Sequence, residues 1–278
     1  MMLTYRAENR FLYYHGIDKK QSKNEFVSAP HPTYEIIFFI GGNAEFLSET
    51  NRYTLAPYDL ILIPPNSYHN MFFLGETKYE RHVITVDHNI GSEIKFKYAN
   101  DTKDAIVIRT NFSHEFISIF DDIEKYCNSI ENNEELQDIL TTLLKSLFYK
   151  IRLNNESNPS TNSKADEHSP IFTQIINYIN ENIYTVNKIE DIANQFYISH
   201  PYLFKLFKKN LGISPHKFLQ EKKLSIAKQL LVKGLSPTEV AFKVGYSSYP
   251  LFYKAFKNYF GYMPSQNKQL LEKEIFEL

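Results

Sequence analysis

Two segments decide the fold of this chain: EDIANQFYIS at residues 190–199 and TEVAFKVGYS at residues 238–247. Each leads into a lysine-containing segment that ends on glycine, KLFKKNLG at residues 205–212 and KAFKNYFG at residues 254–261. The leading segments align at an offset of 48 residues, and the trailing segments align at 49. A repeated short helix, turn and basic second helix predicts two tandem helix-turn-helix units within residues 188–267.

Capping residues mark the helix boundaries in this region. Ser236 is followed by a proline and, three residues on, by Glu239, which is the pattern of a capping box. The dipeptide Ser214-Pro215 predicts the start of a long central helix that runs to about residue 232 and separates the two units. Gly212 and Gly261 stand where a helix ends in a left-handed residue. With a first helix from about residue 171, we expect seven helices.

Charge is distributed unevenly along the chain. Residues 1–170 hold 17 Lys and Arg against 24 Asp and Glu, a net charge of −7, whereas residues 171–278 hold 14 Lys against 8 acids, a net charge of +6. Together they give the formal net charge of −1. A local positive field of this kind suits the phosphate backbone of a nucleic acid. For any single lysine cluster, a solvated helix face is the alternative.

The second helix of each unit is expected to enter the major groove, with its early turns facing base edges. Apolar spacing turns Leu203, Leu206 and Phe207 inward in the first unit, and Phe252, Ala255 and Phe256 in the second. The aromatics among the remaining residues suit thymine methyls or sugars, and covering a neighbouring helix is their alternative role. The predicted DNA contacts are the outward residues His200, Pro201, Phe204, Lys205, Lys208, Ser248, Tyr249, Tyr253, Lys254 and Lys257.

Several motifs carry a family resemblance: IEDIA at 189–193, LFKK at 206–209, GISP at 212–215, IAKQLL at 226–231, VAFKVGY at 240–246 and FKNYFG at 256–261. With them, the region from about 171 to 267 resembles the DNA-binding domain of AraC/XylS-type transcriptional regulators. The resemblance implies two units inserted in successive major-groove turns. By motif alignment it implies base-reading residues at Pro201, Phe204 and Lys205, and at Tyr249, Tyr253 and Lys254.

The chain departs from this family in one respect. The family usually carries arginine where Lys205 and Lys254 stand, and no arginine follows Arg152. Lysine lacks the planar fork with which arginine contacts guanine through two hydrogen bonds. We therefore expect weaker direct guanine readout and a larger contribution from phosphate contacts and A·T-rich DNA shape.

The N-terminal part has a different pattern. From about residue 25 to 87, short β-branched and aromatic runs are interrupted by Gly, Pro or Asn every ten residues or so, which predicts a small antiparallel barrel. Apolar residues then recur at helical spacing over 112–130 and 136–151, which predicts a helical hairpin that serves the core, a dimer seam or both. Residues 154–170 have almost nothing to bury and predict a flexible linker.

These patterns predict an α+β multidomain chain: a cupin-like antiparallel β-barrel with a helical hairpin, then an all-α seven-helix domain with two helix-turn-helix units. The expected divisions are an effector-binding barrel at 1–110, a dimerisation hairpin at 111–153, the linker at 154–170 and the DNA-binding domain at 171–278.

The barrel carries two further motifs. His31-X-X-X-Glu35 and PPNSYH at 64–69 look like the two cupin motifs. In metal-binding cupins the first motif begins His-X-His, but Ala29 stands at the place of the first imidazole. We therefore predict an effector pocket and no bound metal or other cofactor. The expected lining is His31, Tyr34, Glu35, Phe38, Tyr58, Tyr68 and His69.

The alternative is a cupin-type metalloenzyme with an accessory DNA-binding domain. His31, Glu35 and His69 would be its ligands, since imidazole and carboxylate suit zinc, iron or manganese. No Ser-His-Asp or Cys-His arrangement and no glycine-rich phosphate loop is recognisable in the sequence. The remaining barrel and hairpin histidines are scattered and predict no site: His15, His82, His88 and His114.

Composition bears on the cellular compartment and on membrane association. The single cysteine, Cys127, excludes a disulfide framework and fits a reducing cytoplasm. No signal-peptide pattern and no apolar run near the roughly 20 residues of a membrane span is present, so we expect no membrane partner.

The whole arrangement resembles the sugar-responsive members of the AraC group. The resemblance implies an effector pocket in the barrel and dimerisation through the hairpin. We predict a non-enzymatic DNA-binding regulator, an effector-responsive activator of a carbohydrate-utilisation operon. Its expected partners are double-stranded DNA, a small effector of the sugar class, RNA polymerase and a second copy of the chain. A regulator controlled by a protein partner or by its own abundance is a further alternative.

Overall fold

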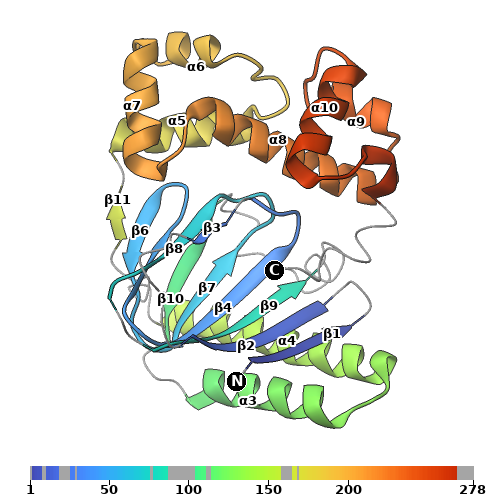
Figure 1. Cartoon of the computed structure of the whole chain (residues 1–278). Coiled ribbons are helices and arrows are strands. Elements are labelled where there is room, and N and C mark those ends of the chain that lie inside the picture. The colour runs from blue at the N-terminus through green and yellow to red at the C-terminus, as the bar shows by residue number, and fades with distance from the viewer. Residues whose placement is uncertain are drawn as a thin grey trace.

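The computed structural model describes residues 2–7, 11–18, 26–28, 30–75, 78–86, 104–110, 114–157, 165–167 and 169–267. A β-rich domain occupies the lower half of Figure 1, with two helices beneath it, and a helical domain lies above. The α+β multidomain class expected from the sequence is confirmed.

Two antiparallel sheets form the β-rich domain. The larger sheet has the order β1-β2-β9-β4-β7-β10, and the smaller has the order β11-β6-β5-β8-β3. Within the described residues no strand pairing joins the two sheets, so the domain is an open sandwich and the term barrel applies only loosely. The strands are β1 (Met2–Ala7), β2 (Phe11–Asp18), β3 (Phe26–Ser28), β4 (Tyr34–Gly41), β5 (Ala44–Leu47), β6 (Asn51–Thr54), β7 (Asp59–Ile63), β8 (His69–Phe73), β9 (Tyr79–Val86), β10 (Ile106–Arg109) and β11 (Ala165–Glu167).

Strand β4 is buried on both faces, and its alternation separates two apolar layers. Ile37 and Phe39 pack between the two sheets with Phe46 of β5. Ile36 and Phe38 point the other way, toward the helical hairpin. Side chains of alternate residues leave a strand on opposite faces, so one strand serves both layers.

The helical hairpin consists of α3 (His114–Ser129) and α4 (Asn133–Ser157) and covers the outer face of the larger sheet. The rings of Phe38 and Phe120 stack with centroids 4.4 Å apart. Most of the predicted apolar stripe is buried as expected. Cys127, Ile130 and Leu143 are half-buried, and Phe112 lies outside the described residues. The buried members of the stripe are Phe116, Ile119, Phe120, Ile123, Leu136, Leu140, Leu144, Leu147 and Ile151.

The segment expected to be a flexible linker contains regular structure at both ends. Helix α4 continues to Ser157, and β11 pairs with the edge of β6, Ala165 opposite Tyr53. Strand pairing is made by backbone groups, so a segment with little to bury can still add to a sheet edge. Composition alone therefore predicted too long a linker.

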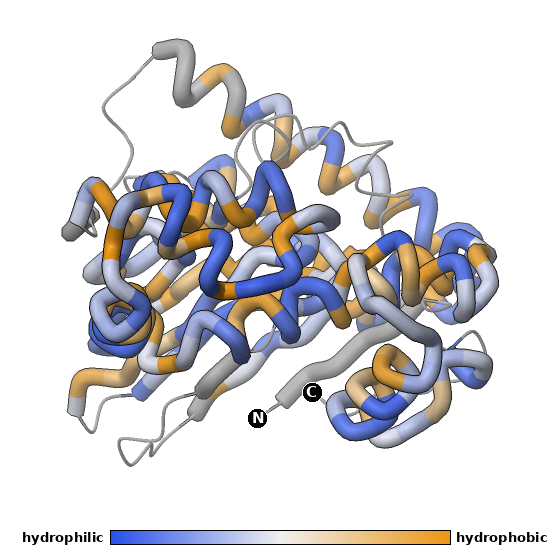
Figure 2. Tube along the Cα trace, turned by 90° about the horizontal axis from the view of Figure 1, so that it is seen from above, coloured by the Kyte–Doolittle hydropathy of each residue, from blue (hydrophilic) through white to orange (hydrophobic). Residues whose placement is uncertain are grey.

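The helical domain contains α5 (Pro170–Glu181), α6 (Ile189–Gln195), α7 (His200–Leu211), α8 (Pro215–Val232), α9 (Pro237–Lys243), α10 (Tyr249–Phe260) and the 3-10 helix η1 (Pro264–Gln266). Over the described residues these make the seven helices expected. Hydrophobic and hydrophilic residues are interleaved along the helical tubes in Figure 2. The capping box is confirmed, because the Ser236 hydroxyl accepts from the Glu239 N–H at 3.3 Å and the Glu239 carboxylate accepts from the Ser236 N–H at 2.9 Å.

The turns of the two helix-turn-helix units have the same hydrogen bonds. The N–H of Ile198 donates to the carbonyl of Ala193 in the first unit, and that of Tyr246 donates to Ala241 in the second, both at 3.0 Å. The equivalent residues before them are left-handed: Tyr197 has φ 52° and Gly245 has φ 87°. The same left-handed turn position is thus occupied by a tyrosine in the first unit and by a glycine in the second.

Packing explains the difference between the two turns. A Cβ on Gly245 would lie 2.3 Å from the Asn187 Oδ1 and 3.1 Å from the Tyr184 carbonyl oxygen. Tyr197, in contrast, is 97% exposed. The second turn therefore requires glycine both because there is no room for a side chain and because the backbone is left-handed. The first turn requires only a residue that can adopt the left-handed conformation.

We expect Gly245→Ala to destabilise the protein by about 2 kcal/mol or more, because steric overlap adds to the left-handed strain. Tyr197→Gly should stay within about 1 kcal/mol of wild type, since relief of strain offsets the added freedom of the unfolded chain. Urea unfolding of the full chain, followed by circular dichroism, measures both. Equal destabilisation by the two substitutions would contradict this account.

Candidate nucleic-acid interface and sensor site

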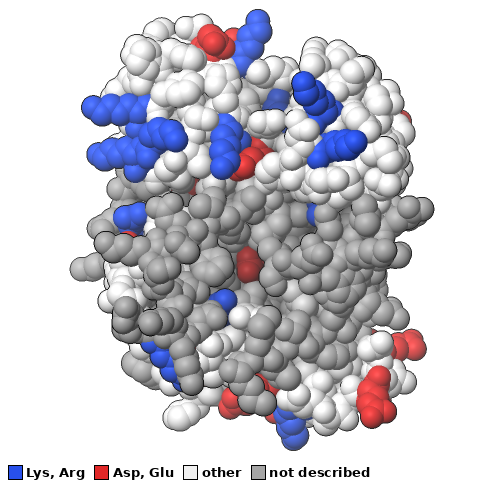
Figure 3. All heavy atoms as spheres, in the orientation of Figure 1, with Lys and Arg blue, Asp and Glu red and all other residues white. Residues whose placement is uncertain are grey.

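The second helix of each unit presents lysines to solvent. Leu203 and Phe207 of α7 and Phe252 and Phe256 of α10 are fully buried, as predicted, and Ala255 is half-buried. Lysine side chains project from the helical domain over both units (Figure 3). The exposed members of the predicted DNA-contact set are Pro201, Lys205, Lys208, Lys254 and Lys257.

The aromatic members of the predicted set are half-buried. Phe204 lies between His200 and His216, with ring centroids 4.9 and 5.7 Å away. Because His216 belongs to α8, Phe204 covers part of a neighbouring helix, which was the alternative role for this residue. The ring of Tyr253 lies beside that of Tyr249, with centroids 6.1 Å apart.

Large apolar side chains on the same units were missed by the sequence reasoning. Tyr197 in the first turn, Tyr202 on α7 and Leu251 on α10 are 97%, 44% and 56% exposed. The alignment of Tyr197 with Gly245 was the available signal, because a bulky residue at a glycine position indicates an open turn.

A polar trio lies at the start of β4 and β8. Nε2 of His31 is 3.0 Å from the Glu35 Oε2, and Nε2 of His69 is 3.3 Å from the same oxygen. Burial alone would raise the pKa of Glu35, but hydrogen bonds to His31 and His69 hold it well below the ordinary value. Two imidazoles thus converge on one ionised carboxylate.

The other nitrogen of His69 limits the protonation of this trio. Nδ1 of His69 lies 3.1 Å from the Ser67 carbonyl oxygen, which can only accept, so Nδ1 carries a proton. The contact between Nε2 and Glu35 therefore needs a second proton on His69 or a cation between them. The three donor atoms lie within 4.8 Å of one another, so the trio could hold a metal ion.

The other residues predicted to line the effector pocket lie elsewhere. Tyr34, Phe38 and Tyr58 pack in the layer against the helical hairpin, on the face opposite Glu35. Tyr68 packs in the core of the helical domain. The structure thus brings together only His31, Glu35 and His69 of the seven.

The two domains meet along α8, where a buried ion pair forms. Glu49, in the turn between β5 and β6, is fully buried and accepts a hydrogen bond from Lys222 of α8. The Glu49 carboxylate also accepts from the Tyr68 N–H and the Asn180 side chain, both at 2.7 Å. Lys222 donates in turn to Asn180. Burial raises the pKa of Glu49, and the Lys222 ammonium opposes that rise.

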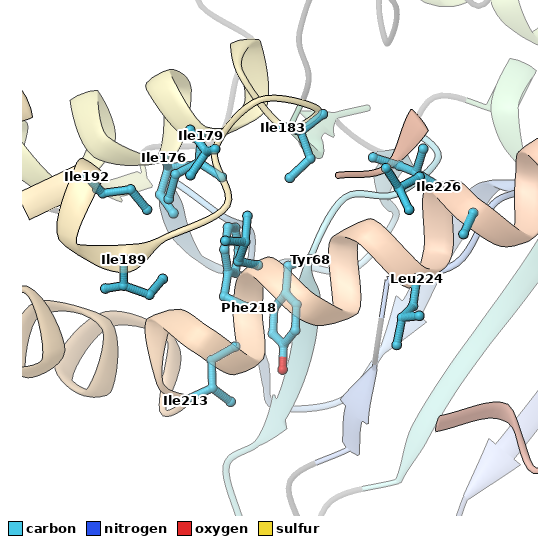
Figure 4. Close-up of a cluster of buried hydrophobic side chains, with 14 of the residues drawn as sticks. Tyr68, Ile176, Ile179, Ile183, Ile189, Ile192, Ile213, Phe218, Leu224 and Ile226 are labelled. Carbon is cyan, nitrogen blue, oxygen red and sulfur yellow. The ribbon is translucent and has the colours of Figure 1, made fainter. Parts of the chain in front are cut away.

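A second loop of the β-rich domain completes this junction. Asn66 accepts a hydrogen bond from the Ser225 hydroxyl at 2.7 Å and donates to the Gln229 side chain at 3.3 Å. The ring of Tyr68 lies against Phe218, with centroids 5.9 Å apart (Figure 4). Residues 66–69 therefore carry His69 of the polar trio and three contacts to α8.

Comparison with known proteins agrees with both halves of the chain. Residues 12–167 match the model of the AraC-like ligand binding domain, and residues 192–269 match a helix-turn-helix domain model. The chain is a DNA-binding transcriptional regulator, and it belongs to the AraC family. These matches do not favour the metalloenzyme alternative.

Named relatives include an operon regulator that matches most of the chain and the regulators of the raffinose and lactose operons. The Msm operon regulatory protein of Streptococcus mutans is 24% identical over 93% of this chain and 92% of its own length. The raffinose operon regulator RafR of Pediococcus pentosaceus is 35% identical over 48% of each chain. The lactose operon transcription activator of Staphylococcus xylosus is 31% identical over 49% of this chain and 48% of its own length.

We expect Lys222→Met to destabilise the full chain by about 3–5 kcal/mol, because it leaves the Glu49 carboxylate buried without its counter-ion. Glu49→Gln should be similarly costly, since it leaves Lys222 buried. The double variant should cost clearly less than the sum of the two, because it removes both charges. Urea unfolding of all four proteins measures the coupling, and additive effects would show that the pair does not interact.

Proposed function

We propose that the chain is an effector-responsive activator of a carbohydrate-utilisation operon. The named relatives that regulate sugar operons support this assignment, and two of them match over about half of each chain. In this proposal the β-rich domain controls the DNA-reading units through the junction on α8, because it holds the helix that lies between the two units. In this proposal the protein acts in the cytoplasm without catalysing a reaction. Within the described residues, no helix is long and apolar enough to cross a bilayer.

The proposal includes DNA reading by the second helix of each unit. The proposed contacts are the ten outward residues named from the sequence. Lys205 and Lys254 lie near the middle of α7 and α10, and Lys208 and Lys257 lie in the last turn of these helices. The exposure of these four lysines supports their assignment. Activation implies a contact with RNA polymerase, which we include in the proposal.

A second copy of the chain is part of the proposal. Tyr149 and Leu153, one turn apart on α4, are 60% and 55% exposed. Apolar side chains at this spacing form a stripe that a partner helix could cover. We assign the dimer seam to the α3–α4 hairpin for this reason.

Lys205→Ala should relax sequence preference, while Lys208→Ala should weaken binding to all sequences alike. Loss of a base contact removes about 1–3 kcal/mol of discrimination, whereas loss of a phosphate contact lowers the salt slope by about 0.9. Fluorescence anisotropy measures both, using DNA selected from a random library by the wild-type chain and a scrambled competitor. Lys233→Ala, an exposed lysine beyond the end of α8, is the control. Parallel losses in both reading-helix variants would contradict the assigned roles.

The effector site is tested by thermal unfolding with a panel of mono- and oligosaccharides. A ligand that binds the trio should raise the Tm of the wild type. At a concentration of 100 times its Kd, it should stabilise the folded wild type by about 2.7 kcal/mol, and it should have little effect on the Tm of Glu35→Gln. Glu45→Gln changes a half-buried glutamate of β5 in the same domain and should respond as the wild type does. If no sugar changes the Tm of the wild type, control by a protein partner or by abundance is favoured instead.

A further inference from the structure

A second polar cluster lies within the apolar layer between the larger sheet and the helical hairpin. Tyr13 and His15 come from β2, Glu80 and His82 from β9, and Glu124 from α3. His15 and His82 are directly opposite each other in the strand register. Tyr13 and His82 are buried among the residues that otherwise form a continuous apolar surface. Buried polar groups in such a layer need a specific set of partners.

Three of these residues offer metal-binding atoms at one point. Nδ1 of His15 is 3.0 Å from the Glu124 Oε2, and the donor atoms of His15, His82 and Glu124 all lie within 4.8 Å of one another. A tetrahedral zinc site, with bonds of about 2.1 Å, places its donors about 3.4 Å apart. The side chain of His15 is 19% exposed, and its ring stacks on that of His82 with centroids 4.1 Å apart.

Each imidazole is anchored at one nitrogen by a partner on the sheet. Nε2 of His15 is 3.2 Å from the Glu80 Oε1, and Glu80 is itself paired with Lys78. Nδ1 of His82 is 2.6 Å from the Tyr13 hydroxyl, and that hydroxyl donates to Glu124 at 3.4 Å. Partners of this kind orient metal-binding histidines in proteins.

Two buried groups of this cluster have shifted pKa values. Burial, and then the proximity of His15, lowers the pKa of His82 to about 3. Burial and the nearby Glu124 raise the pKa of Tyr13, so its phenol stays protonated and keeps its hydrogen bonds.

We propose that His15, His82 and Glu124 form a site for a divalent first-row transition metal ion, with Zn²⁺ as the readiest occupant. Two imidazoles and a carboxylate are the donors that such ions prefer. The ion joins β2, β9 and α3, so it fastens the helical hairpin to the sheet at a point separate from His31, Glu35 and His69. The proposal does not depend on the identity of the effector.

The test is titration of the full chain with Zn²⁺ after treatment with a chelator, by calorimetry and by thermal unfolding. We expect one equivalent to bind at this site and to raise the Tm. Glu124→Gln, a change at a half-exposed position on α3, should weaken binding at least tenfold and abolish most of the Tm shift. Glu115→Gln on the same helix, 68% exposed, is the matched control and should bind as the wild type does.

A third variant separates the two histidine clusters. His69→Gln should retain the zinc affinity of the wild type, because His69 belongs to the other trio. Loss of zinc binding in His69→Gln with full retention in Glu124→Gln would place the metal at His31, Glu35 and His69 and overturn the proposal. Failure of the wild type to bind zinc would also overturn it.

Discussion

The carboxylate of Glu49 is the constraint on which the arrangement of the two domains depends. It is fully buried, and its hydrogen bonds come from three separate elements: the loop before β8, helix α5 and helix α8. A buried carboxylate without these donors would cost several kcal/mol, so the elements must be in place together. Asp104 fixes the turn itself, because it accepts from the N–H groups of Glu49 and Thr50, both at 2.9 Å.

Helix α8 connects this junction to the geometry of DNA reading. Its residues from Glu221 to Ala227 are buried without a break, which is expected of a helix enclosed on all sides. Lys222 of α8 donates a hydrogen bond to Glu49 of the β-rich domain. The next residue, Lys223, donates to Asn187 at 2.6 Å, beside the Gly245 turn. The neighbouring lysines therefore tie α8 to the β-rich domain and to the loop before the first helix-turn-helix unit, which lies beside the Gly245 turn of the second unit. A displacement of α8 at the junction would change the relative placement of the two units.

The parts predicted from the sequence are those that local pattern encodes. Helical spacing, the Ser236 capping box and the repeat of the two units depend on residues within a few positions of one another, and all three were confirmed. The junction joins Glu49 to Lys222 across 173 positions, and no local pattern marks either residue as a partner. The pocket residues show a different failure: Tyr34 and Phe38 alternate with Glu35, so strand periodicity already placed them on the opposite face.

The order of residues in the loop before β8 links the polar trio to α8. His69 contacts Glu35, while its neighbour Tyr68 packs on Phe218 and donates its N–H to Glu49. The N–H of Asn66 in the same loop donates to the carbonyl of His31 at 2.7 Å, and its side chain bonds to α8. A ligand that reorients either imidazole would act on backbone that is directly bonded to the junction. The loop is short, and its Asn66 has a left-handed backbone conformation with φ 63°. A shift at the trio would therefore pass to α8 through few residues.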